Sequence, residues 1–593
     1  MSQTQLEKQT SKNVQDKASV IWETATHLYG TYKPHEYGKV ILPMTVIKRF
    51  DDALADTKDK VIEQYNKFRQ MGSNNTGLES AVYQKLTGYK FYNTSKFNLS
   101  KLTEDPDNIR ANFEAYLRGY SENVIDIINN FNFFDEIKKM DDAGLLNTVI
   151  TEFCSKKASM KPDEITSADM GYIFEELIRK FSESYDEQAG AHFTARDIIY
   201  LMTELLVVND KDKFKEHGIA VTAYDMAMGT SQMLGCLTEK LQEIDPDAKV
   251  TCYGQEINNE TYAIAKSDML IKGGDAENMK WGDTLSQDAF SGYEFDYIIS
   301  NPPFGIDWKK EREVVDKEFA LGELGRFEGG LPSIGDGQML FLQNGLKKLK
   351  DTGRMAIIQN GSSLFTGDAG SGPSNIRKHF IENDYVDAII QLPTDLFYNT
   401  PIVTYIWIIS KKKEEKRKGY IQLIDASKCY IKRRKNIGNK RVDLDEKCIN
   451  LLLKAYINFN NEVITEEGIS VESRKYENFS FGFTKIIIEH PIVDETGMPV
   501  LKRNKMIADP EKRDFEIVPF GHDVDDYFAK NIKTSDKYAW IEKGKSKVGY
   551  DIPFTRLFFK FDEPRKSEDI FEEIRTLIEN ESILLKELLK NGK

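Results

Sequence analysis

The sequence predicts an α/β protein with an N-terminal helical domain, a Rossmann-like domain built on a mostly parallel sheet, and a C-terminal helical tail. Three observations indicate this fold. Apolar residues recur at helical spacing up to about residue 160, short β-branched runs alternate with helical stretches from about residue 165, and one apolar stripe returns near the C-terminus. Because 593 residues exceed one ordinary core, we expect domains at 1–160, 161–460 and 461–593.

The composition is typical of a soluble globular protein. Hydrophobic residues make up 40% and charged residues 30% of the chain, and the mean hydropathy is -0.49. We see no N-terminal apolar signal and no stretch near the ~18 apolar residues that span a bilayer, so we expect no membrane partner and a cytoplasmic protein. Five scattered cysteines without a CxxC pair predict reduced, mostly buried thiols and no metal site.

The net charge of -14 argues against a protein that coats DNA with its whole surface. Any contact with phosphates must therefore be local or shared with a partner. Three basic clusters are candidates, at 411–413, 416–418 and 432–435. The alternative for each cluster is a solvated face of a loop or hairpin.

The first region, from residue 14 to about 160, shows apolar residues three and four apart, as in the runs at 107–132 and 134–153. Between two of its helical patterns, MGSNNTG at 71–77 is a loop by composition. No residue pattern there indicates chemistry.

The central region contains six short apolar runs separated by helical stretches, which predicts βαβ units. The last two runs are joined by only LPTDLFYNTP, too short for a crossover helix, so we expect an antiparallel pair that closes the sheet. The runs are GIAVTAY (218–224), AKVTCYG (248–254), FDYIIS (295–300), RMAIIQ (354–359), YVDAIIQ (385–391) and IVTYIWIIS (402–410).

The C-terminal region gives weak signals after about residue 460 and a clear one at its end. There an apolar stripe predicts a helix that either docks a partner or packs on its own domain. The stripe consists of Ile570, Ile574, Leu577, Leu584 and Leu588.

The sharpest motif is Asn301-Pro302-Pro303-Phe304, directly after the apolar run FDYIIS. Open α/β sheets bind ligands at the carboxyl ends of their strands, so the motif lies where a substrate would bind. An exocyclic amine on adenine is a poor nucleophile until two acceptors localise its lone pair. The Asn301 amide oxygen and the Pro302 carbonyl supply two acceptors, Pro303 keeps Pro302 extended, and Phe304 offers a ring on which a flipped base stacks. The alternative is a strand that ends in an ordinary turn.

Acidic residues follow the strands upstream of this motif. Asp225 begins a glycine turn that leads into a helix, Glu256 suits a ribose diol, and Asp283 suits an adenine amino group. Taken alone, each acid fits a helix cap or a surface charge better than a ligand contact. Three in register, one after each successive strand, predict a nucleoside-type cofactor site.

These segments resemble the modification subunit of type I restriction-modification systems over most of residues 10–440. The N-terminal part, with YSENVIDIINNFNFFDEI, is similar to that family's helical domain. The segments that match in order and spacing are GYIFEELIRKF (171–181), GAHFTARDIIYLM (190–202), YGQEINNETYAIAKSDMLI, GDTL, NPPFG and IRK with DAIIQLPTDLFYNT.

The resemblance implies a class I S-adenosylmethionine-dependent methyltransferase acting on adenine N6 in DNA, in the gamma order of motifs. It implies DNA, a specificity subunit, a restriction subunit and a second copy of the chain as partners. It also implies association with the nucleoid and poor binding of specific DNA by the chain alone. It assigns the target adenine to Asn301, Pro302, Pro303 and Phe304. It assigns the cofactor to His192, Phe193, Thr194, Asp225, Gly229, Thr230, Ser231, Glu256, Asp283 and Asn301.

One departure from the family pattern concerns the first cofactor loop, where Met226 replaces a proline and Ser231 a glycine. If Ser231 needs positive φ, the strain costs of order 1 to 3 kcal/mol and weakens cofactor binding. Two other hypotheses stay open. One is methylation of a protein glutamine or of an RNA base, because an NPPF loop can bind any planar amine. The other is a scaffold whose cofactor loop has decayed at Met226 and Ser231.

Overall fold

The computed structural model describes residues 16–166, 194–210, 218–398, 400–503, 505–560 and 566–591, with scattered positions between 169 and 180. The chain divides into two compact units, Met1–Ile552 and Pro553–Lys593. Among the described residues, no helix is both long enough and apolar enough to cross a membrane.

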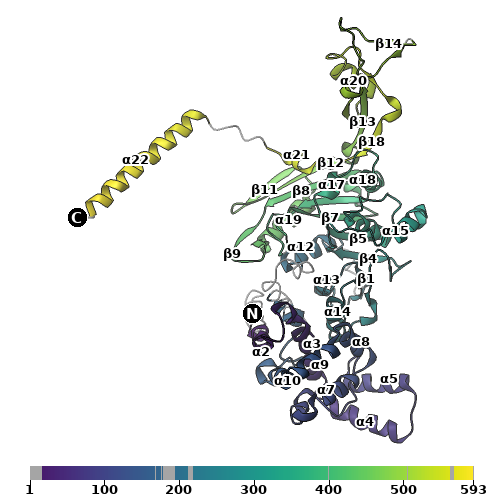
Figure 1. The fold of residues 1–593 in the computed structure, drawn as a ribbon, viewed down its shortest axis with the longest axis vertical. Helices are drawn as coiled ribbons and strands as arrows, with labels where there is room; N and C mark the ends of the chain where they lie inside the picture. Colours follow the sequence, from purple (N-terminus) through teal and green to yellow (C-terminus); the bar gives the residue numbers. More distant parts are fainter. Residues whose placement is uncertain are drawn as a thin grey trace. The chain divides into compact units, whose positions relative to one another are not determined.

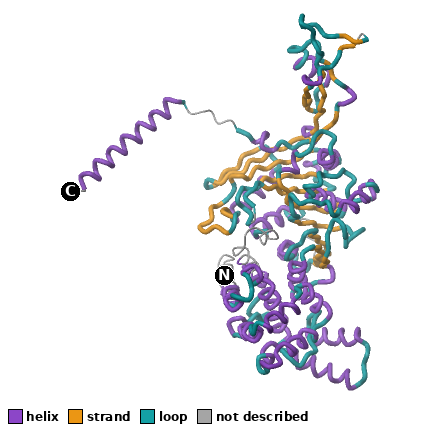
Figure 2. Tube along the Cα trace, viewed as in Figure 1, coloured by secondary structure: helices purple, strands orange, loops and turns teal. Residues whose placement is uncertain are grey.

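The N-terminal region is helical, as predicted, and Figure 2 shows its helices gathered together apart from the strands. The predicted loop at 71–77 joins two of them, although the second already begins at Thr76. The helices are α2 (Ala25–Leu28), α3 (Gly38–Leu54), α4 (Lys58–Gln70), α5 (Thr76–Thr87), α6 (Leu99–Leu102), α7 (Ile109–Arg118), α8 (Glu122–Asn130), α9 (Phe133–Asp142) and α10 (Leu146–Cys154).

The central region forms a ten-stranded, mostly parallel sheet, and all six predicted runs are strands in it (Figure 1). The mixed α/β fold is thereby confirmed. In spatial order the strands are β11 (Glu462–Glu466), β12 (Ile469–Glu477), β8 (Tyr420–Lys428), β6 (Val386–Gln391), β7 (Thr404–Ser410), β5 (Leu349–Asn360), β4 (Phe295–Ser300), β1 (Ala220–Asp225), β2 (Lys249–Glu256) and β3 (Met279–Trp281).

Strands β6 and β7 are the predicted antiparallel pair, but they do not close the sheet. The free edge of β6 pairs in parallel with β8, and β12 and β11 extend the sheet further. The short segment 411–419 carries the chain across the end of β6 and makes this pairing possible. Polar residues such as Gln422 and Asp425 interrupt the apolar pattern of β8, so the sequence did not predict this strand.

Helices on the sheet share one hydrophobic core with the N-terminal helices. Buried residues of both regions form a single contiguous cluster. Polar contacts reinforce it, since Lys266 and Tyr262 of α14 donate to Asp126 of α8 at 2.8 and 3.1 Å. The helices that follow or flank the strands are α12 (Arg196–Val207), α13 (Gln232–Ile244), α14 (Asn259–Ile271), α16 (Gln338–Lys347), α18 (Gly372–Glu382) and α19 (Glu446–Asn458).

The region after β12 contains a smaller antiparallel sheet of β13 (Gly482–Glu489), β16 (Asp514–Pro519), β17 (Trp540–Ile541) and β18 (Lys547–Tyr550). The C-terminal unit contains α21 (Phe554–Phe558) and the predicted terminal helix α22 (Ser567–Asn591). Its stripe residues Ile570, Ile574 and Leu577 are exposed, and the side chains of Leu584 and Leu588 lie outside the described residues. The domain limits at 160 and 460 stay predictions.

Candidate functional site

The order of strands reverses between β1 and β4. From β1 the chain moves outward to β2 and β3, whereas from β4 it moves the opposite way to β5. Asp225 is the last residue of β1, and Asn301 directly follows β4, so both lie at the carboxyl edge of the parallel strands. In open α/β sheets, ligands bind in the crevice at such a reversal.

A cavity of about 300 Å³ lies at this edge. Ser231 and Pro302 are buried outside its wall, Phe304 is half-buried against the core, and His192 and Phe193 lie outside the described residues. The predicted residues that line the cavity are Thr194, Asp225, Gly229, Thr230, Glu256, Asp283, Asn301 and Pro303.

Other lining residues were not predicted. Gln255 and Gly282 directly precede the predicted residues Glu256 and Asp283, so their position in the sequence could have indicated that they line the cavity. Phe341 comes from α16 and Ile306 from beyond the motif, and no local pattern marks either of them.

The loop after β1 has positive φ at Gly229 (53°) and at Ser231 (66°). Serine thus occupies a left-handed conformation that favours glycine, at a cost of order 1 to 3 kcal/mol. Its amide donates to the Met228 carbonyl at 2.7 Å, which keeps the turn closed. Met226 is buried, and its sulfur accepts from Asn344 of α16 at 3.5 Å. Ser231 and Met226, the two departures from the family pattern, are therefore both held in place by hydrogen bonds.

Asp225 is a buried carboxylate, only 1% exposed. Its Oδ1 accepts from the Ser300 hydroxyl at 2.7 Å and from the Ala227 amide at 3.1 Å. Burial raises the pKa of Asp225 to about 7, and the nearby Glu256 adds to the rise against the two hydrogen bonds. Near neutral pH, both the neutral and the charged form of this carboxyl are therefore populated.

Glu256 connects the end of β2 to the glycine loop. Its Oε2 accepts from the Gly229 amide at 2.9 Å and its Oε1 from the Asn258 amide at 2.8 Å. Each oxygen keeps a second lone pair, so the carboxylate can still accept from a diol.

Asp283 caps a turn, because its two oxygens accept from the Leu285 and Ser286 amides, each at 3.1 Å. Asp283 therefore caps a turn and not a helix, and it also lines the cavity.

Asn301 is held by one half of its amide and leaves the other half unpaired. Its Nδ2 donates to the Thr194 hydroxyl at 2.8 Å. Its Oδ1 is buried and accepts no hydrogen bond from any described residue. An unpaired buried acceptor costs roughly 1 to 3 kcal/mol, and a ligand in the cavity that Asn301 lines could offset this cost by supplying a donor.

The chain after the motif is held by Trp308, which sequence reasoning missed. Trp308 is 2% exposed, and its indole Nε1 donates to the Ser333 carbonyl at 2.9 Å. Its backbone amide donates to the Ile334 carbonyl at 3.1 Å, and the Gly337 amide donates to the Ile306 carbonyl at 3.0 Å. These bonds tie the segment after Asn301 to a loop about thirty residues later.

The charge of the cavity limits its ligand. Its described walls carry three carboxylates and no lysine, arginine or histidine. Such a wall disfavours a pyrophosphate cofactor and favours a ligand with positive charge and hydrogen-bond donors.

Comparison with known proteins gives two family matches. The N-6 DNA Methylase model matches residues 166–482, and the HsdM N-terminal domain model matches residues 17–153. The type I restriction enzyme MjaIX methylase subunit of Methanocaldococcus jannaschii is 23% identical over 438 residues, 70% of this chain and 74% of that protein. The MpnII methylase subunit of Mycoplasma pneumoniae is 26% identical over 394 residues, 63% and 69% of the two chains.

Among solved structures, the methyltransferase subunit of a type I restriction-modification system from Streptococcus thermophilus has the same fold. It aligns with a TM-score of 0.59 and 22% identity, and the alignment covers 78% of this chain and 96% of that one.

Proposed function

This chain belongs to the N-6 DNA methylase family, and we propose that it is the modification subunit of a type I restriction-modification complex, transferring the methyl group of S-adenosylmethionine to N6 of a flipped adenine. The observation that carries the proposal is the Asn301 amide, whose oxygen is buried and unpaired among the described residues. An adenine amine in the cavity would supply the missing donor.

The residues present fit S-adenosylmethionine. The cofactor brings a sulfonium and an ammonium group, and both suit a cavity whose described walls hold carboxylates without a cation. Asp225 would face the positive charge, Glu256 would accept from the ribose diol, and Gly229 lets the backbone approach closely. When bound, the cofactor supplies a methyl group already activated by its sulfonium.

The chain's own residues would bind the target amine and orient it toward the methyl group. Thr194 holds the Asn301 amide so that Oδ1 accepts one N–H of the target amine. The Pro302 carbonyl accepts the other, and the accessible part of Phe304 stacks on the base. Withdrawing both protons toward acceptors localises the nitrogen lone pair, and alignment of the amine with the methyl group provides most of the catalysis.

Replacing Asn301 by alanine tests the proposal. Removing one oriented polar group at a reacting centre costs about 100-fold or more in turnover. We expect Asn301→Ala to lose methyl transfer to DNA by that factor while it keeps the wild-type melting temperature. The matched control is Asn383→Ala, an exposed asparagine at the opposite edge of the sheet, which keeps full activity.

The assay uses a radiolabelled methyl donor with DNA, RNA and protein offered in parallel. Undiminished transfer to DNA by Asn301→Ala would overturn the role of this amide. Counts in protein or RNA alone, with none in DNA, would replace the DNA proposal by the corresponding alternative. Absence of cofactor binding in a calorimeter would favour the scaffold.

We further propose the partners implied by the resemblance, namely a specificity subunit, a restriction subunit and a second copy of the chain. The net charge of -14 supports a division in which another subunit provides most of the contacts to DNA.

A further inference from the structure

We propose that a basic β-hairpin beside the cavity, residues 428–443, binds the phosphate backbone of the DNA whose base enters the site. This inference rests on the proposed function and adds a specific contact surface to it. The hairpin consists of β9 (Ile431–Ile437) and β10 (Lys440–Asp443), which pair in antiparallel fashion.

The hairpin concentrates positive charge in an acidic chain. Residues 428–443 contain seven lysines and arginines and one acid, Asp443, which pairs with Arg433 and Lys440, against a net charge of -14 overall. Lys428, Lys432, Arg434 and Arg441 are exposed, and none of the four forms an ion pair with a described carboxylate. Uncompensated cations on a two-stranded ribbon suit DNA, because such a ribbon fits the major groove and its cations displace the counterions of phosphates.

The hairpin lies at the same edge of the sheet as the cavity. Strand β8 runs parallel to β6, which runs in the same direction as β1 and β4, so all four end at one edge. The hairpin begins directly after β8 ends at Lys428. In Figure 1, β9 lies near α12, the helix that begins just after Thr194.

Buried contacts attach the hairpin to α12, the helix that begins two residues after Thr194. Lys440 is 1% exposed, and its Nζ donates to Asp197 of α12 at 2.8 Å and to the Leu396 carbonyl at 3.0 Å. The Leu444 amide donates to the same Asp197 carboxylate at 2.9 Å. Thr194, which holds Asn301, lies three residues before Asp197, so their Cα atoms are at most roughly 11 Å apart. The base of the hairpin is therefore held close to Thr194 and to the Asn301 amide that Thr194 binds.

A second basic segment, 411–418, provides the contrast. It lies between β7 and β8, at the opposite edge of the sheet. Its Lys413 and Arg417 are buried and bind Asp384 and Asp387, each at 2.6 Å. These two cations stabilise the fold, whereas Lys412, Lys416 and Lys418 remain exposed far along the strands from the cavity. Lys416 pairs with Glu414 at 3.3 Å and Lys418 pairs with Glu415. Replacing the three exposed lysines therefore removes the same charge as the hairpin variant, without removing unpaired cations beside the cavity.

The experiment measures how salt weakens binding of the full-length chain to a fluorescent 30-base-pair duplex. The hairpin variant is Lys432→Gln/Arg434→Gln/Arg441→Gln, and the control is Lys412→Gln/Lys416→Gln/Lys418→Gln. The slope of log K against log salt falls by about 0.9 for each lost phosphate contact, so we expect the hairpin variant to lose about 2 to 3 and the control nothing. The single variant Arg434→Gln should lose about 0.9.

Two further readouts separate this inference from the proposed function. Calorimetry with S-adenosylmethionine should give wild-type affinity for the hairpin variant, and methylation should show a raised KM for DNA with kcat within about twofold. An unchanged slope in both the triple and the single variant overturns the inference while Asn301→Ala still tests the methyltransferase. An unchanged slope with loss of binding to a co-expressed specificity subunit also overturns it, and makes the hairpin a protein interface.

Discussion

Two buried aspartates show how the same side chain serves two purposes in this molecule. Asp225 and Asp387 are each 1% exposed, and each belongs to a strand of the same sheet. For both, burial pushes the pKa upward. Asp225 has no cation beside it in the described cavity wall, and its pKa is raised to about 7. Around Asp387 two arginines outweigh the burial, and its pKa is lowered to about 2.

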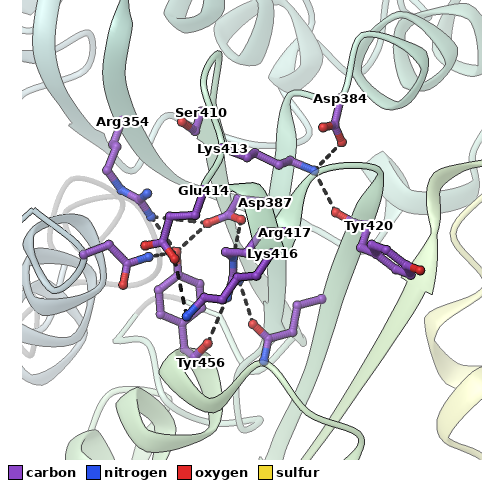
Figure 3. A network of polar contacts seen from close by, with 12 residues as sticks. Arg354, Asp384, Asp387, Ser410, Lys413, Glu414, Lys416, Arg417, Tyr420 and Tyr456 are labelled. Atoms are coloured by element: carbon purple, nitrogen blue, oxygen red, sulfur yellow. Dashed lines mark hydrogen bonds and ion pairs between the residues drawn. The ribbon is translucent and has the colours of Figure 1, made fainter.

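The surroundings of Asp387 form a closed network, drawn in Figure 3. Its Oδ1 accepts from Arg417 at 2.6 Å, and its Oδ2 accepts from Arg354 at 3.3 Å and from the Tyr456 hydroxyl at 2.5 Å. These residues come from β5, β6, α19 and the turn before β8. A buried carboxylate whose charge is balanced internally joins elements of the fold. Asp225, which has no counterion in the described cavity wall, is the carboxylate that we propose for a cationic ligand.

The largest expected effect is on stability, from Asp387→Ala. Removing this carboxylate leaves Arg417 buried without its counterion and deprives Arg354 of one of its two nearby carboxylates, which costs about 3 to 5 kcal/mol in free energy of unfolding. Urea unfolding followed by circular dichroism measures it, with the exposed Asp351→Ala as a control within about 0.5 kcal/mol of wild type. If Asp387→Ala lowered the free energy of unfolding by less than 1 kcal/mol, the network around Asp387 would be dispensable, and the contrast with Asp225 would fail.

A smaller effect, on binding rather than on stability, is expected from Asp225→Asn. The amide keeps the shape and removes the negative charge, so S-adenosylmethionine should bind about 10- to 100-fold more weakly, the equivalent of 1.5 to 3 kcal/mol. Folding should be unaffected or improved, since an uncompensated buried charge is removed. Titration calorimetry measures the affinity for the cofactor, and thermal unfolding of the same preparation measures the stability. Wild-type affinity in this variant would contradict the assignment of Asp225 to the cofactor.

The smallest expected effect is the pH dependence. The folded pKa of Asp225, about 7, lies above its ordinary value of 3.8, so between these values the folded protein binds more protons than the unfolded chain. Its contribution to stability therefore falls as pH rises from about 4 to 7. A cationic cofactor favours the carboxylate, so its affinity should rise up to about tenfold per pH unit toward 7 and then level off.

Asp225→Asn should flatten this affinity profile, measured by calorimetry between pH 5.5 and 8.5. A sloping profile that survives in the variant would assign the titration to another group. Asp387 acts in the opposite sense, because its folded pKa of about 2 lies below 3.8. Its stabilisation is complete above about pH 4 and is lost as pH falls through about 2.

The sequence by itself predicted what depends on residues adjacent in the chain. Asn301 was found because it follows an apolar strand directly, and Asp225 and Glu256 because each ends such a strand. In a parallel sheet, strand ends of this kind meet at one edge whatever the details of packing. The family motifs and the strain at Ser231 were likewise readable from local sequence.

Only the tertiary structure decided what depends on residues far apart in the chain. The bond from Asn301 to Thr194 spans 107 positions, and the bond from Lys440 to Asp197 spans 243. The pairing of β8 with β6 placed one basic segment at the edge of the sheet that holds the cavity and turned part of the other inward. Local patterns carry no information on such pairings, because burial and charge balance arise only when distant segments pack together.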